Sequence, residues 1–233
     1  MEETPFQWGQ LLLPDTPPPP VEAVEGSSWI APMLVAVSVL LFLLSLRSFL
    51  NVLPYLSDSV LRARGSAALE GSVKVSRDRN QIAAVFLIPA ILLVYRYRLF
   101  DIEWFHTLSE DFRLLAIAGV MVLYLLLRFL LSRWLRPRRR YDDFVLSYRA
   151  GYTFFILLMM LALVTVGVLA ILGSSDLTVK TFLLVETGVI FFLYLLRRGQ
   201  ILSLSCNPLT TFLYLCALEL LPLALLVVPA MIL

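Results

Sequence analysis

Long apolar blocks separated by charged segments dominate this chain. Six blocks reach or approach 18 residues, and a helix needs roughly 20 residues to cross a bilayer core about 30 Å thick. The blocks occupy residues 29–46, 82–99, 114–131, 152–172, 179–196 and 209–233. Runs such as VLLFLLSL do not alternate apolar with polar residues, as the strands of a membrane β-barrel do. The pattern predicts an all-α membrane protein, a bundle of about six transmembrane helices.

The composition agrees with this pattern. Hydrophobic residues make up 60% of the chain and charged residues 15%, against roughly 45–50% and 25% in soluble domains. A water-soluble core cannot accommodate that excess. The first 28 residues hold five acidic residues and no Lys or Arg, the reverse of the basic start of a secretory signal peptide. We therefore expect the first apolar block to be retained as a helix.

One polar segment precedes the predicted six-helix domain, residues 29–233, and a second lies inside it. Residues 1–28 carry a run of four prolines at 17–20, which favours an extended, disordered outer tail; alternatively, its apolar residues rest on the membrane surface or on a partner. Residues 48–80 interleave apolar and charged positions, which predicts a short interfacial helical segment between the first and second spans.

The basic residues fix the expected orientation, because Lys and Arg accumulate in cytoplasmic loops. With the amino terminus outside, the inner loops hold 14 basic residues and the outer loops 4. We expect a multi-pass membrane protein with both termini on the non-cytoplasmic side. The basic cluster of one inner loop either contacts anionic lipid headgroups or is a topology signal only. It comprises Arg136, Arg138, Arg139 and Arg140.

Residues with catalytic or ligand chemistry are sparse. His106 is the only histidine, and Cys206 and Cys216 are ten residues apart, so neither a haem nor a zinc ligand set is predicted. The serines of the sequence lack a nearby base that would activate a nucleophile. We expect no catalytic residue, no metal and no cofactor, and nothing in the sequence indicates nucleic-acid binding.

Two carboxylates inside predicted spans are the remaining candidates. Glu186 lies in the fifth block and Glu219 in the sixth, both near mid-depth by residue count, and intramembrane charges usually face the bundle interior or a wet cavity. Pro222 predicts a kink one turn after Glu219, because proline cannot donate to the Leu218 carbonyl. These carboxyls form either a proton or cation site, or neutral hydrogen bonds to neighbouring helices.

Three stretches resemble a known family. The run FLYLCALELLPLALL begins at Phe212, FVLSYRAGYTFFILL at Phe144 and FLYLLRRGQ at Phe192. Together they are similar to an integral membrane family of Bacteroidota, domain-of-unknown-function family 4271, over residues 29–233. The resemblance implies a bacterial inner-membrane location and brings no established activity.

Two functions follow from these observations. The first is a non-enzymatic subunit or scaffold of a membrane assembly, whose partners are the lipid bilayer and either other membrane proteins or further copies of the chain. The alternative is a small proton- or cation-coupled transporter, or an energy-coupling subunit, that uses the intramembrane carboxylates.

Overall fold

The computed structural model describes residues 30–61, 72–99, 110–134, 141–203, 207–222 and 224. The predicted tail, His106, Cys206, the basic cluster at 136–140 and the last residues of the sixth apolar block lie outside these ranges.

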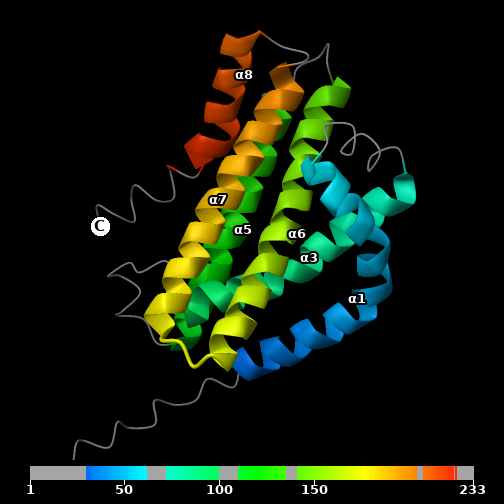
Figure 1. Ribbon diagram of the computed structural model, residues 1–233. Helices are drawn as coiled ribbons and strands as arrows, with labels where there is room; N and C mark the ends of the chain where they lie inside the picture. Colours follow the sequence, from blue (N-terminus) through cyan, green and yellow to red (C-terminus); the bar gives the residue numbers. More distant parts are fainter. Residues whose placement is uncertain are drawn as a thin grey trace, which may run out of the picture.

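The described residues form helices and no strands, which confirms the predicted all-α class (Figure 1). In chain order the elements are α1 (Ile30–Leu61), α3 (Val73–Arg96), α5 (Glu110–Trp134), α6 (Tyr141–Ile171), α7 (Asp176–Ser203), α8 (Pro208–Leu215) and the π-helical turn η1 (Cys216–Leu220).

Five helices are long and apolar enough to cross a bilayer, namely α1, α3, α5, α6 and α7. The chain is therefore a multi-pass membrane protein. The apolar stretch Leu209–Leu220 in α8 and η1 is shorter, and the part of the predicted sixth span beyond residue 224 lies outside the described ranges. The expected count of six spans is thus not confirmed.

The surface agrees with a lipid environment. Large apolar side chains are exposed along α1, α5, α6 and α7, for example Leu44, Leu115, Val164 and Val185. Soluble monomers rarely expose contiguous apolar patches on this scale, whereas a bilayer solvates them.

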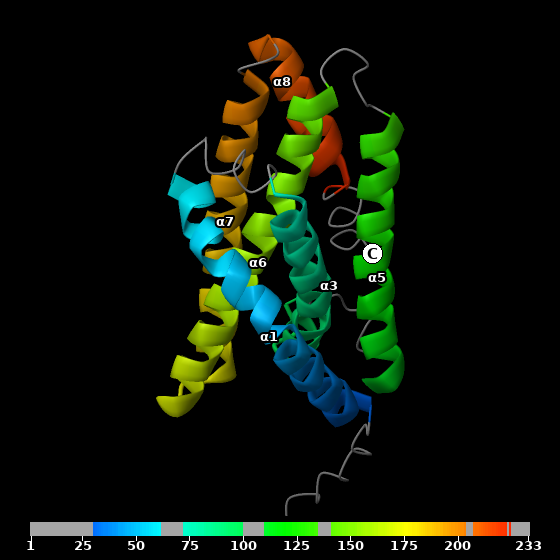
Figure 2. The same cartoon turned by 90° about the vertical axis from the view of Figure 1, so that its right-hand side faces the viewer.

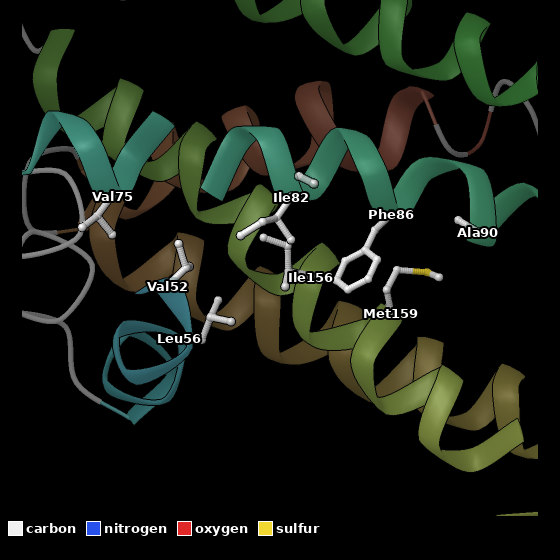
Figure 3. Packing of buried hydrophobic residues seen from close by; sticks show 9 residues of the cluster. Val52, Leu56, Val75, Ile82, Phe86, Ala90, Ile156 and Met159 are labelled. Carbon is white, nitrogen blue, oxygen red and sulfur yellow. The ribbon is translucent and has the colours of Figure 1, made fainter. Parts of the chain in front are cut away.

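The main apolar core joins α1, α3 and α6. Figure 3 shows Ile82 and Phe86 pointing from α3 toward Ile156 and Met159 of α6, while Val52 of α1 closes the cluster. Phe86 also packs against two aromatic rings of α1, with centroids 5.9 and 6.2 Å away. A second cluster, between α6 and α7, contains Phe154, Ile190 and Tyr194.

The helix α1 is longer than predicted. Residues 48–61 belong to α1, and residues 73–80 begin α3. The described part of the segment 48–80 therefore forms no separate interfacial helix. Val52 and Leu56 explain the continuation, because their i, i+4 spacing places both on the buried face of one helix. The helix bends in this half (Figure 1), which contains Pro54, a residue that disrupts the helical hydrogen-bond ladder.

The helix ends gather at two ends of the bundle. The start of α1, the end of α3, and the turn between α6 and α7 lie together at the lower end in Figure 1. There Arg96 donates to Asp176 over 3.3 Å, which connects α3 to α7. In the α6–α7 turn, Gly173 has φ of +66°, a conformation that glycine adopts without a steric penalty. The end of α5, the end of α7 and the start of α8 lie at the opposite end (Figure 2).

The helix α5 stands at the side of the bundle (Figure 2). It packs on α3 and on η1, and η1 lies between α5 and α6 in this view. The contact of α5 with α7 is made through a long polar side chain, which belongs to the site described next.

Candidate functional site: a buried arginine–glutamate cluster

The predicted candidate Glu219 lies in η1, and its side chain is 1% exposed. Its Oε1 atom contacts polar groups of three described residues. The hydroxyl of Tyr194 donates to it over 2.7 Å, and Nη2 of Arg128 lies 3.0 Å away. Arg198 completes the set with an ion pair from Nη1. Two guanidinium groups beside one carboxyl stabilise its charged form.

The helix α7 supplies two of these partners from one face. Tyr194 and Arg198 are four residues apart, so their side chains lie on adjacent turns, and Arg198 Nη1 donates to the Tyr194 hydroxyl over 3.0 Å. Arg198 Nε donates over 3.0 Å to Ser147 Oγ on α6. Arg198 and Ser147 are each fully buried. The cluster thus binds α6, α7 and η1 together.

The helix α5 joins the cluster through Arg128, whose Nη2 donates to the Tyr194 hydroxyl over 2.6 Å. Gly151 of α6 makes this reach possible. A Cβ at that position would lie 2.7 Å from Arg128 Nη2, closer than real Cβ contacts allow. A side chain at position 151 would therefore require the guanidinium to shift away from α6.

Tyrosine rings lie beside the arginines. The Arg128 guanidinium lies 5.2 Å from the ring centroid of Tyr148 and 5.7 Å from that of Tyr194. Tyr148 contacts Tyr152 edge to face, and buried Arg79 of α3 lies over the Tyr152 ring at 5.8 Å. Such cation–π contacts stabilise a desolvated guanidinium by up to about 2 kcal/mol.

We call Arg128, Ser147, Tyr194, Arg198 and Glu219 the arginine–glutamate cluster. Its formal charge is +1, since two arginines share one carboxylate. Arg128 Nε and Arg198 Nη2 are buried and have no hydrogen-bond partner among the described residues. Breaking a buried ion pair of this kind by removing one partner costs roughly 3–5 kcal/mol, so the cluster strongly constrains how the helices pack.

The kink expected at Pro222 stays a prediction. The residues before it form the π-helical turn η1, in which the backbone N–H of Leu221 donates to the Cys216 carbonyl five residues earlier. Pro222 itself is buried. π-Helical turns occur mostly as single-turn bulges inside α-helices, frequently at functional sites. Here the turn accompanies the placement of Glu219 against α5 and α7.

The second candidate, Glu186, has a separate environment. Thr165 of α6 donates a short hydrogen bond to its Oε1, and its buried Oε2 has no hydrogen-bond partner in the described part of the chain. Twelve residues of α7 separate Glu186 from Arg198, about 18 Å along the helix. The two carboxyls, expected at similar depth, are therefore at different levels and form no common site.

The remaining predicted contacts stay predictions. Arg136, Arg138, Arg139 and Arg140 lie outside the described residues. Within the described ranges, no three His, Cys, Asp or Glu side chains come together in a way that could hold a metal ion.

Sequence reasoning missed the partners of Glu219. Arg198 was counted among the residues of an inner loop, yet α7 continues through it to Ser203. Arg128 carried a usable signal, because it is an isolated positive charge inside an apolar block, opposite in sign to Glu219. Intramembrane charges commonly pair with one another, so this pair was predictable in principle.

Comparison of the chain with protein-family models, with curated proteins and with solved structures found no match.

Proposed function

We propose that the protein is a non-enzymatic subunit or scaffold of a membrane assembly. The observation that carries this proposal is the contact set of Glu219, because this almost fully buried carboxyl is held by two arginines and a tyrosine from two other helices. A carboxylate fixed in this way fastens α5, α7 and η1 together. It is poorly suited to repeated uptake and release of a proton, since protonation would remove the counter-charge of two buried guanidinium groups.

We further propose that the protein belongs to the Bacteroidota family named above and sits in the bacterial inner membrane with both termini in the periplasm. The segmental distribution of Lys and Arg supports this orientation. The joint position of the α1 start and the α6–α7 turn at one end of the bundle is compatible with it (Figure 1).

A proton- or cation-coupled transporter is the second candidate, and Glu186 is the residue that favours it. Its carboxyl has one hydroxyl partner and one oxygen without a hydrogen bond among the described residues. Mid-span carboxyls in such surroundings occur in proton relays. On this reading Glu186, rather than Glu219, is the titrating group.

Purification in a mild detergent separates the two functions. A subunit or scaffold should bring down stoichiometric membrane-protein partners or form a defined oligomer, and it should not acidify proteoliposomes in response to any solute gradient. A monodisperse monomer that moves protons with a solute would contradict the proposal.

Glu186→Gln and Glu219→Gln form a matched pair for tests in cells. In a deletion strain, a structural role predicts that complementation by each variant follows its abundance in the membrane. Normal abundance of Glu186→Gln without complementation would instead support the transporter.

A further inference from the structure

Among the described residues, Arg198 and the largely buried Arg128 share one carboxylate, and this leaves positive charge in excess. Glu219 compensates one of the guanidinium groups of Arg128 and Arg198, and the neighbouring polar groups of the cluster are neutral hydroxyls. An uncompensated charge in low-dielectric surroundings is costly unless a counter-charge reaches it. The cluster therefore has the electrostatic character of an anion site.

Unused hydrogen-bond donors lie in the same place. Arg198 directs Nε at Ser147 and Nη1 at Tyr194 and Glu219, while its buried Nη2 lacks a partner in the described part of the chain, as does Arg128 Nε. Buried donors in native proteins are nearly always satisfied. The Arg128 side chain is 16% exposed, so part of it reaches the surface of the bundle.

The cluster lies near one end of its helices. Arg128 is six residues from the end of α5 and Arg198 five residues from the end of α7, about 8–9 Å along either axis. The 28 residues of α7 span about 42 Å, more than a hydrocarbon core of about 30 Å. Part of α7 therefore extends beyond the hydrocarbon core. Exposed Trp134 ends α5 with a residue typical of the headgroup interface.

We propose that Arg128 and Arg198 bind a phosphate group at this end of the bundle. Guanidinium groups match phosphate oxygens with paired, charge-assisted hydrogen bonds, and basic pockets between transmembrane helices bind anionic lipid headgroups. The phosphate belongs to an anionic phospholipid or to a free phosphate anion. This site is made of other residues than the predicted headgroup contact at Arg136, Arg138, Arg139 and Arg140, and it does not depend on the proposed subunit role.

Delipidated protein in neutral detergent micelles tests the proposal directly. The probes are short-chain phosphatidylglycerol, short-chain phosphatidylcholine and inorganic phosphate, and binding is followed by thermal stabilisation and by native mass spectrometry. We expect Arg128→Met to weaken binding about tenfold, which corresponds to about 1.4 kcal/mol. The matched control is Arg133→Met, which removes an exposed arginine from the same helix and should bind like the wild type.

Because Arg128 also contacts Glu219, Arg128→Lys is the second variant. It retains the charge and loses the planar fork of donors, so the lysine variant should fold and still bind more weakly than the wild type. Preference for phosphatidylglycerol over phosphatidylcholine identifies a lipid headgroup as the source, and binding of inorganic phosphate identifies a free anion. The proposal is overturned if the wild type binds neither phosphatidylglycerol nor inorganic phosphate. It is also overturned if Arg133→Met and Arg128→Met weaken binding equally.

Discussion

Replacing Glu219 by Gln should destabilise the folded protein far more than the same replacement at Glu186. Gln retains the size of the side chain and one acceptor oxygen, replaces the other oxygen with an amide donor and removes the charge. At Glu219 the change leaves two buried guanidinium groups without their counter-charge, for which roughly 3–5 kcal/mol is expected. At Glu186 the hydrogen-bond partner among the described residues is the Thr165 hydroxyl, and hydrogen bonds between membrane helices contribute about 0.6 kcal/mol on average and about 1.7 at most.

The free energy of unfolding in mixed micelles, from titration with a denaturing detergent, measures this difference. The double variant Arg198→Met/Glu219→Met and its two single variants form a double-mutant cycle. We expect an interaction energy of about 1.5 kcal/mol or more, the range of close charge pairs. Equal stability losses for Glu219→Gln and Glu186→Gln, or additive losses in the cycle, would refute the argument that charge pairing holds α7 to η1.

Three further outcomes follow from the structure. Gly151→Ala should reduce thermal stability by displacing the Arg128 guanidinium, whereas Gly188→Ala, which meets open space, should leave the melting temperature within error or raise it slightly through helix propensity. Asp176→Asn should change the unfolding free energy by less than about 1 kcal/mol, since its ion pair is exposed. In a cysteine-free background, a cysteine at position 138 should resist an impermeant thiol reagent added to the periplasmic side, and its labelling would reverse the proposed orientation.

The helical class and the membrane setting could be predicted because they depend on long-range averages of hydropathy. Five of the predicted apolar blocks overlap α1, α3, α5, α6 and α7. Helix ends were predicted less well, since charged residues were assigned to loops. Arg79 and Arg198 instead lie inside helices and are buried, which a periodicity argument misses when the partner of the charge comes from elsewhere in the chain.

The candidate site was predicted only in its acidic half. Glu219 stood out as a carboxyl in an apolar run, but its partners Tyr194 and Arg198 are more than twenty residues away in sequence, and Arg128 more distant still. Their meeting depends on the π-turn before Pro222 and on the missing side chain at Gly151. The π-turn is a local backbone feature, and Gly151 acts through its contact with Arg128. Neither has a signature in hydropathy.

The ionisation state of Glu219 in a bilayer tests the account most directly. Infrared spectra of the reconstituted protein distinguish a protonated carboxyl from a carboxylate, and comparison of the wild type with Glu219→Gln isolates the contribution of this one group. Our account predicts that the variant loses a carboxylate band at neutral pH and that the protonated carboxyl region is unchanged. Loss of a protonated carboxyl band in Glu219→Gln would contradict the ion-paired cluster and with it the fastening role of Glu219.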